Sequence, residues 1–137
     1  MSALQLQIRI RLLQESDRLW FFGSHAFSVP QAKSSAGETD VWVYGYIVGG
    51  DLTATGSKMN TGPSFTKNTH LAIASRSSVT EKSACLSVEL KAGPVRDALN
   101  LVDHPDLLGS RVYVRGDIVE AYFGIPGVKD VTEYVLK

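Results

Sequence analysis

The sequence predicts a mainly β domain in the form of a small closed barrel, and three observations support this prediction. Apolar and polar residues alternate in several segments, most clearly in residues 41–48 and 111–136. Glycine and proline interrupt these segments, as in Gly124-Ile-Pro-Gly127, where a turn is expected. The chain has 137 residues, which suits one domain with a single core. We therefore expect a single domain.

The first 26 residues are expected to be an N-terminal extension made of strands. Residues 4–12 alternate almost without fault, and after a polar turn the segment 18–23 resumes the β pattern. Because residues 1–13 are apolar only at alternate positions, they form neither a signal-peptide core nor a membrane span. Ser28 and Pro30 then predict a short helix that runs to about residue 34.

The barrel is expected over residues 27–137, and its strongest strand is 41–48, which is β-branched and aromatic throughout. Gly45 in the middle of that strand suggests a bend or a close approach of backbones. Trp42 points away from the side of Val41 and Val43, so something outside the barrel should cover it, and residues 4–22 are the natural candidate.

The remaining elements follow in an order that identifies the type of barrel. A polar loop over residues 49–69 is longer than most connections, and such loops are commonly functional or disordered. Strands are expected at 70–75 and 84–90, then a short helix at 94–101, and finally two strands within 111–136. This is the order of an OB-fold, a five-stranded Greek-key barrel with a helix between strands three and four.

Several segments together resemble a known family: Phe27-Ser-Val-Pro-Gln-Ala32, Val41-Trp-Val-Tyr-Gly-Tyr-Ile-Val-Gly-Gly50, Asn68-Thr-His-Leu-Ala-Ile-Ala74, Leu99-Asn-Leu101, His104-Pro-Asp-Leu-Leu-Gly109 and Gly116-Asp-Ile-Val-Glu-Ala-Tyr-Phe-Gly-Ile-Pro-Gly-Val128. Their order and spacing resemble a bacterial OB-fold-like domain family of undefined function. That family occurs in secreted or lipid-anchored envelope proteins and beside some extracellular nucleases. The resemblance implies a non-catalytic, extracytoplasmic module whose targeting segment is absent from this chain.

The composition gives no sign of catalysis, a metal or a cofactor. Cys85 lies in an apolar run and is expected to be a buried, inert thiol. His25, His70 and His104 lack the spacing of metal ligands and are expected at the surface or at caps. No Gly-x-Ser-x-Gly elbow is present, and Asp117 with Glu120 is expected to serve solvation rather than acid–base chemistry.

The sequence does predict a ligand-binding surface. OB-folds usually bind ligands on strands two and three, between the loop after strand one and the loop between strands four and five. These loops are expected at residues 49–69 and about 123–130. The candidate ligand-binding residues are Lys58, Phe65, Lys67, Arg76, Tyr122, Phe123 and Lys129. Lys82 could add charge at one rim. For each aromatic residue, packing against the barrel is an equally good interpretation.

The leading hypothesis is a non-enzymatic OB-fold binding module for single-stranded nucleic acid, by analogy of fold and family. Lys plus Arg and Asp plus Glu both number 14, so the net charge is zero and such a ligand would need a local basic patch. The alternative is an envelope domain that binds an oligosaccharide or a protein partner. A basic, aromatic groove between the two loops would favour nucleic acid, and a neutral or covered surface would favour the alternative.

Overall fold

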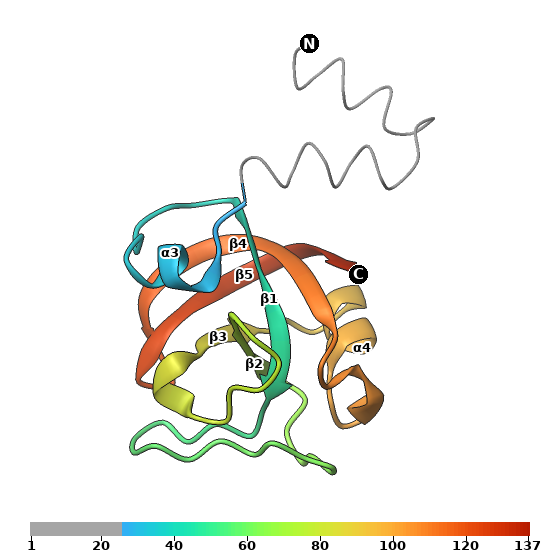
Figure 1. The fold of residues 1–137 in the computed structure, drawn as a ribbon. Helices are drawn as coiled ribbons and strands as arrows, with labels where there is room; N and C mark the ends of the chain where they lie inside the picture. Colours follow the sequence, from blue (N-terminus) through green and yellow to red (C-terminus); the bar gives the residue numbers. More distant parts are fainter. Residues whose placement is uncertain (1–25) are drawn as a thin grey trace.

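A computed structural model describes residues 26–137 (Figure 1). The strands expected within residues 4–23 lie outside the described residues. The elements, in chain order, are α3 (Val29–Lys33), β1 (Val41–Gly49), β2 (His70–Ala74), the 3-10 turn η1 (Lys82–Ala84), β3 (Leu86–Glu89), α4 (Pro94–Leu99), the 3-10 turn η2 (Pro105–Leu107), β4 (Arg111–Tyr122) and β5 (Ile125–Leu136). Each strand and helix expected after residue 26 is present. Their ends differ from the expected ones by at most two residues, except at the turn between β4 and β5.

The five strands close into a barrel in the order β1-β2-β3-β5-β4, and β4 pairs back onto β1. Neighbouring strands are antiparallel except β3 and β5, which run parallel. This is the strand order of an OB-fold, with α4 between strands three and four. The predicted fold class is therefore confirmed.

The barrel interior holds one main apolar core, and each of the two helices adds side chains to it. Val29 and Ala32 of α3, and Val95 and Leu99 of α4, are buried against the strands. Figure 1 shows α3 and α4 on opposite sides of the barrel. Helix α3 begins as predicted, because Ser28 and Gln31 form a reciprocal capping box around its first turn.

The turn between β4 and β5 lies earlier than the sequence suggests. Phe123 and Gly124 have φ values of +59° and +80°, and Tyr122 pairs with Ile125, so these two residues form the hairpin turn. Gly127 instead lies within β5, where a Cβ atom would meet the Ser87 side chain and would lie 2.9 Å from its carbonyl oxygen. The prediction of a turn at Gly124-Ile-Pro-Gly127 is therefore wrong. Phenylalanine is uncommon at positive φ, so nothing in the sequence predicts Phe123 in the turn.

Trp42 lies apart from the main core, as the alternation of β1 predicts. Its side chain is 7% exposed and belongs to a small cluster with Tyr113, against which Tyr44 and Val135 pack. The proposed cover for Trp42, residues 4–22, lies outside the described residues.

Candidate functional site

The usual ligand surface of an OB-fold, the outer side of β2 and β3, is covered in this protein by its own loops. All five residues of β2 are buried. Ala72 and Ala74 form a second apolar cluster with Val48, Leu52 and Cys85. The side chains packed against that cluster come from the connecting segments, from β1 and from the start of β5: Tyr46, Met59, Val79, Phe123 and Ile125. Little of this surface is therefore left for a ligand.

The loop over residues 50–69 is held in place by the carboxylate of Asp51. Its oxygens accept hydrogen bonds from the Asn60 amide at 3.0 Å, from the Thr66 backbone N–H at 3.0 Å and hydroxyl at 3.2 Å, and from the Lys67 backbone N–H at 2.9 Å. Burial is the largest single influence on the Asp51 pKa and raises it, but these hydrogen bonds together outweigh burial and lower the pKa. Asp51 is thus an ionised anchor of the loop.

Asn60 and Lys82 also hold this loop in place. Asn60 exchanges two backbone hydrogen bonds with Gly50, both of 2.9 Å, and its amide nitrogen also donates to the Ser64 carbonyl at 2.7 Å. The Lys82 ammonium donates to the carbonyls of Thr53 and Gly56 at 2.8 and 3.0 Å. Lys82 is 3% exposed, so the expectation that it adds charge at a rim is wrong. Its cation binds the loop backbone instead.

His70 connects this loop to the β4–β5 turn. Its Nε2 accepts the Leu52 backbone N–H at 3.0 Å, so Nδ1 carries the proton and donates to the Thr69 hydroxyl at 2.8 Å. Burial, aided by the nearby Lys67 cation, lowers the His70 pKa to about 4, although Asp51 opposes this shift. His70 is fully buried, so the expected surface or capping role is wrong for this residue. It is a neutral structural imidazole.

Three of the seven predicted ligand-binding residues lie together beside His70. The Phe123 ring centroid is 4.1 Å from that of His70 and 4.8 Å from that of Tyr122. The Lys129 ammonium lies 5.3 Å from the centre of the Tyr122 ring, a cation–π contact. These aromatic rings therefore pack mainly against one another and against the covered surface.

The other four predicted residues are dispersed. Phe65 is 8% exposed and belongs to the main core, which leaves it little surface for a ligand. Lys58, Lys67 and Arg76 are exposed. Lys58 lines a shallow hollow of about 390 Å³ beside Asp51, whereas Arg76 follows the end of β2. The exposed cations do not form a groove lined by the predicted aromatic residues.

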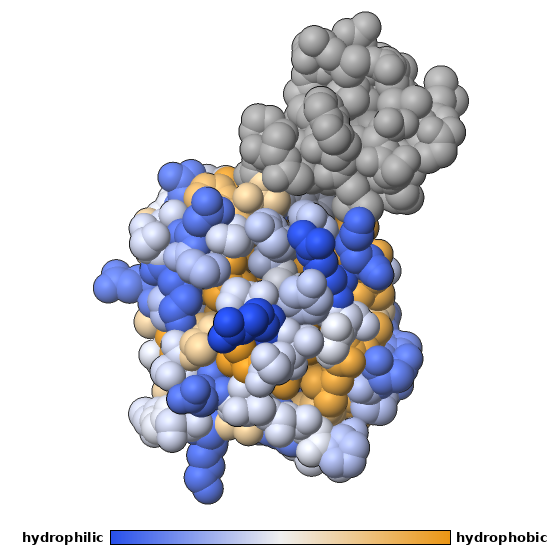
Figure 2. Space-filling view, viewed as in Figure 1, coloured by the Kyte–Doolittle hydropathy of each residue, from blue (hydrophilic) through white to orange (hydrophobic). Residues whose placement is uncertain are grey.

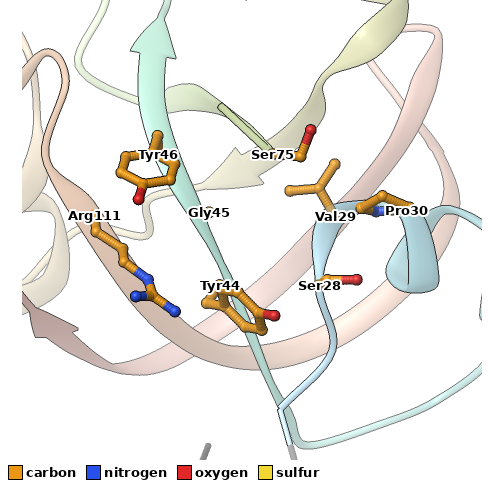
Figure 3. A pocket seen from close by; sticks show the side chains of 8 residues that line it. All are labelled: Ser28, Val29, Pro30, Tyr44, Gly45, Tyr46, Ser75 and Arg111. Atoms are coloured by element: carbon orange, nitrogen blue, oxygen red, sulfur yellow. The ribbon is translucent and has the colours of Figure 1, made fainter. Parts of the chain in front are cut away.

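A better-formed pocket of about 340 Å³ lies between α3, β1 and β4 (Figure 3). Its lining residues are Ser28, Val29, Pro30, Tyr44, Gly45, Tyr46, Ser75 and Arg111. Figure 3 shows Tyr46 and Arg111 on one side of β1, Tyr44 over the strand, and Ser28, Val29, Pro30 and Ser75 on the other side. The pocket therefore has an aromatic, cationic wall opposite a wall with two hydroxyl groups.

The aromatic wall follows from the pairing of β1 with β4. Tyr44 is paired with Tyr113 and Tyr46 with Arg111 in the strand register. The rings of Tyr44 and Tyr113 stack with centroids 5.3 Å apart, and the Arg111 guanidinium carbon lies 5.1 Å and 5.6 Å from their centres. The guanidinium is thus held by ring faces.

Arg111 differs from Arg115, which occupies an equivalent outward position on the same strand. Arg115 binds the Asp40 carboxylate through Nε at 2.9 Å and the Glu133 carboxylate at 3.1 Å. Arg111 makes a 3.3 Å hydrogen bond to the Tyr113 hydroxyl. Its Nε is buried and has no hydrogen-bond partner among residues 26–137. The pocket therefore contains a cation that no carboxylate of the described residues neutralises.

Sequence reasoning missed this pocket, although part of the signal was present. Alternation placed Tyr44 and Tyr46 on the outer face of one strand and Arg111 and Tyr113 on the outer face of another. The OB-fold pairs its first and fourth strands, which brings these four side chains together. The contribution of Ser28, the N-cap of α3, to the pocket had no signal in the sequence, because the docking of that helix depends on tertiary packing.

Neither a metal site nor a membrane-spanning helix is present among the described residues. Within residues 26–137, no group of three or more His, Cys, Asp or Glu side chains could hold a metal ion. None of the helices in the same range is long and apolar enough to cross a membrane. Cys85 is fully buried as expected, and burial raises its pKa to about 11, so the thiol stays protonated.

Comparison with known proteins supplies the family. No curated protein and no solved structure matches the chain. A family profile described as a domain of unknown function, DUF6359, matches residues 27–137. The match covers the whole barrel and begins at the segment just before α3. The chain belongs to the DUF6359 family of domains of unknown function.

Proposed function

We propose that this domain is a non-enzymatic module that binds carbohydrate in the pocket between α3, β1 and β4. The observation that carries the proposal is the pocket wall formed by Tyr44 and Tyr46. Tyrosine rings present flat apolar faces on which the C–H face of a sugar ring can stack, and their hydroxyls can hydrogen-bond to sugar hydroxyls. Ser28 and Ser75 supply further hydroxyl groups on the opposite wall. At about 340 Å³ the pocket is at the small end of ligand sites, which suits one or two sugar rings.

Two observations disfavour single-stranded nucleic acid as the ligand. The outer face of β2 and β3, where bases usually stack on OB-folds, is covered by the protein's own loops. The chain also has no net charge. Figure 2 shows hydrophilic and hydrophobic residues interspersed on the visible face. A groove that tracks a phosphate backbone needs a band of cations to offset the neutral charge of the chain as a whole.

The chemistry of the lining residues favours binding over hydrolysis. Most glycosidases need two carboxyl groups on either side of the scissile bond. The residues that line this pocket include no Asp, Glu, His or Cys. The Ser28 hydroxyl, in addition, accepts the Gln31 backbone N–H as a helix cap. A sugar in this pocket would therefore meet groups that hold it and none that cleaves it.

The proposal includes an extracytoplasmic location at the bacterial cell envelope, where carbohydrate is abundant. This part rests on the resemblance to envelope proteins alone. Fractionation of the native bacterium with an antibody against the domain tests it. Detection in the cytosol alone would contradict the location and would leave the binding proposal intact.

The binding proposal is tested with a glycan array followed by calorimetric titration of the best ligand. Tyr44→Ala and Tyr46→Ala should each weaken binding about tenfold or more, because Tyr46→Ala removes a ring of the pocket wall and Tyr44→Ala removes the ring that also contacts Arg111. Tyr134→Ala is the matched control, since Tyr134 is 36% exposed on β5 and does not line the pocket. Thermal melting confirms that each variant is folded. Salt-sensitive binding of single-stranded DNA, with no glycan bound, would overturn the proposal.

A further inference from the structure

We infer that the pocket selects saccharides that carry a carboxylate, such as a uronic acid unit, and that Arg111 is the residue that recognises it. This inference rests on the proposed carbohydrate function and adds the class of sugar. It starts from the electrostatics of the pocket, where a cation is present and acidic side chains are absent from the lining.

The first step is the contrast between two arginines on β4. Arg115 is neutralised by Asp40 and Glu133. Arg111, four residues earlier, has no ion pair with any residue of the described chain and donates one weak hydrogen bond to Tyr113. A partly buried cation without a carboxylate partner is costly unless a ligand supplies one. The ligand that fits Arg111 is therefore an anion.

The second step is the orientation of the guanidinium. The Arg111 guanidinium carbon lies 5.1 Å from the centre of the Tyr44 ring and 5.6 Å from the centre of the Tyr113 ring, so the two rings hold the guanidinium in place. Cation–π contacts leave the N–H groups of an arginine able to donate, and their fork matches the two oxygens of a carboxylate. Arg111 Nε is buried and has no hydrogen-bond partner among residues 26–137. Arg111 is thus held in advance for planar anion recognition, and little side-chain entropy is lost on binding.

The third step joins the anion to a sugar. Tyr46 lies beside Arg111 in the strand register, so a sugar ring stacked on Tyr46 can direct a ring carboxylate toward the guanidinium. Ser75, on the opposite wall, immediately precedes the exposed Arg76, which adds positive charge at that end of β2. A uronic acid supplies both the apolar ring face and the carboxylate that this arrangement requires.

The test uses oligosaccharides of glucuronic, galacturonic and mannuronic acid, each compared with its carboxyl-reduced counterpart of the same length and linkage. The full chain should bind at least one acidic oligosaccharide about tenfold or more tightly than its reduced form, because bonds to a charged donor are stronger than neutral ones. Arg111→Met, which keeps much of the apolar stem, should abolish this preference, and Arg111→Lys should restore part of it. Lys91→Met, which removes an exposed charge outside the pocket, should leave the preference unchanged.

The outcomes separate the inference from the function on which it rests. Equal binding of acidic and reduced oligosaccharides would overturn the selection for carboxylates and leave carbohydrate binding intact. A preference for acidic forms that persists in Arg111→Met would overturn the role of Arg111. If no saccharide of either kind binds to the folded protein, both the inference and the proposed function are wrong.

Discussion

Replacement of Asp51 by alanine should loosen the loop over residues 50–69 and lower the stability of the whole domain. The carboxylate accepts hydrogen bonds from Asn60, from both the backbone and the hydroxyl of Thr66, and from the backbone of Lys67. The backbone φ of Asp51 is also +47°, a conformation that aspartate and asparagine tolerate better than alanine. Both effects act in the same direction.

The size of the effect follows from exposure. Hydrogen bonds to a charged group contribute about 1.5–3 kcal/mol each when buried. Thr66 and Lys67 are exposed, so water can replace the carboxylate as their hydrogen-bond acceptor. We therefore assign about 0.5 kcal/mol to each of the four hydrogen bonds, or about 2 kcal/mol in all. With about 1 kcal/mol for the positive φ, Asp51→Ala should cost about 3 kcal/mol. Asp51→Asn, which keeps the shape and one acceptor oxygen, should cost about 1 kcal/mol.

The pH dependence gives an independent check. The folded-state pKa of Asp51 is lowered, so its contribution is fully present above the unfolded-state pKa of about 3.9 and is lost as the pH falls through the folded value. The stability difference between the wild type and Asp51→Asn should therefore shrink below about pH 4.

Urea unfolding followed by tryptophan fluorescence at pH 7 and pH 3 measures both quantities. The Asn variant is the control that separates charge from backbone conformation. An alanine variant within about 0.5 kcal/mol of the wild type at pH 7 would refute the anchoring role of Asp51, as would a difference that grows as the pH falls.

Three further predictions concern buried groups. Gly127→Ala should lower stability by about 2–3 kcal/mol, because its Cβ would overlap Ser87 of β3, and a urea midpoint equal to that of the wild type would contradict this. Cys85 should react with a thiol reagent at pH 8 far more slowly in the folded protein than in denaturant, since burial raises its pKa to about 11; equal rates would disprove the burial. His70, whose pKa is lowered to about 4, should stay neutral at pH 5 in an NMR titration. The contribution of His70 to the free energy of unfolding should be complete above about pH 6.5 and should decline as the pH falls toward 4. Between these two pH values, the stability of His70→Gln should depend less on pH than that of the wild type.

The strands and helices after residue 26 could be predicted because their signals are local. Alternation in β1 and β4 and the cap at Ser28 each depend on a few neighbouring residues, and the order of the elements then identifies the barrel. The hairpin turn was misplaced because Phe123 adopts a positive φ that its residue type disfavours. Its packing against His70 offsets that cost.

The functional surface was harder to predict because it depends on contacts between distant segments. Sequence could not show that Lys82 would bind the carbonyls of Thr53 and Gly56 or that Phe65 would enter the core. It also could not show that the loops would cover the outer face of β2. Whether the remaining exposed cations, such as Lys58 and Arg76, contact a ligand stays a prediction.

The most direct test of the carbohydrate pocket is an NMR titration of the isotopically labelled chain with the uronic acid oligosaccharides and with their carboxyl-reduced counterparts. The proposal predicts that the largest changes in amide chemical shift occur at Tyr44, Tyr46 and Arg111, where the sugar should stack. Changes centred on Phe123 and Lys129 would place the ligand at the β4–β5 turn instead and contradict the proposal. An absence of changes with every oligosaccharide would contradict it equally.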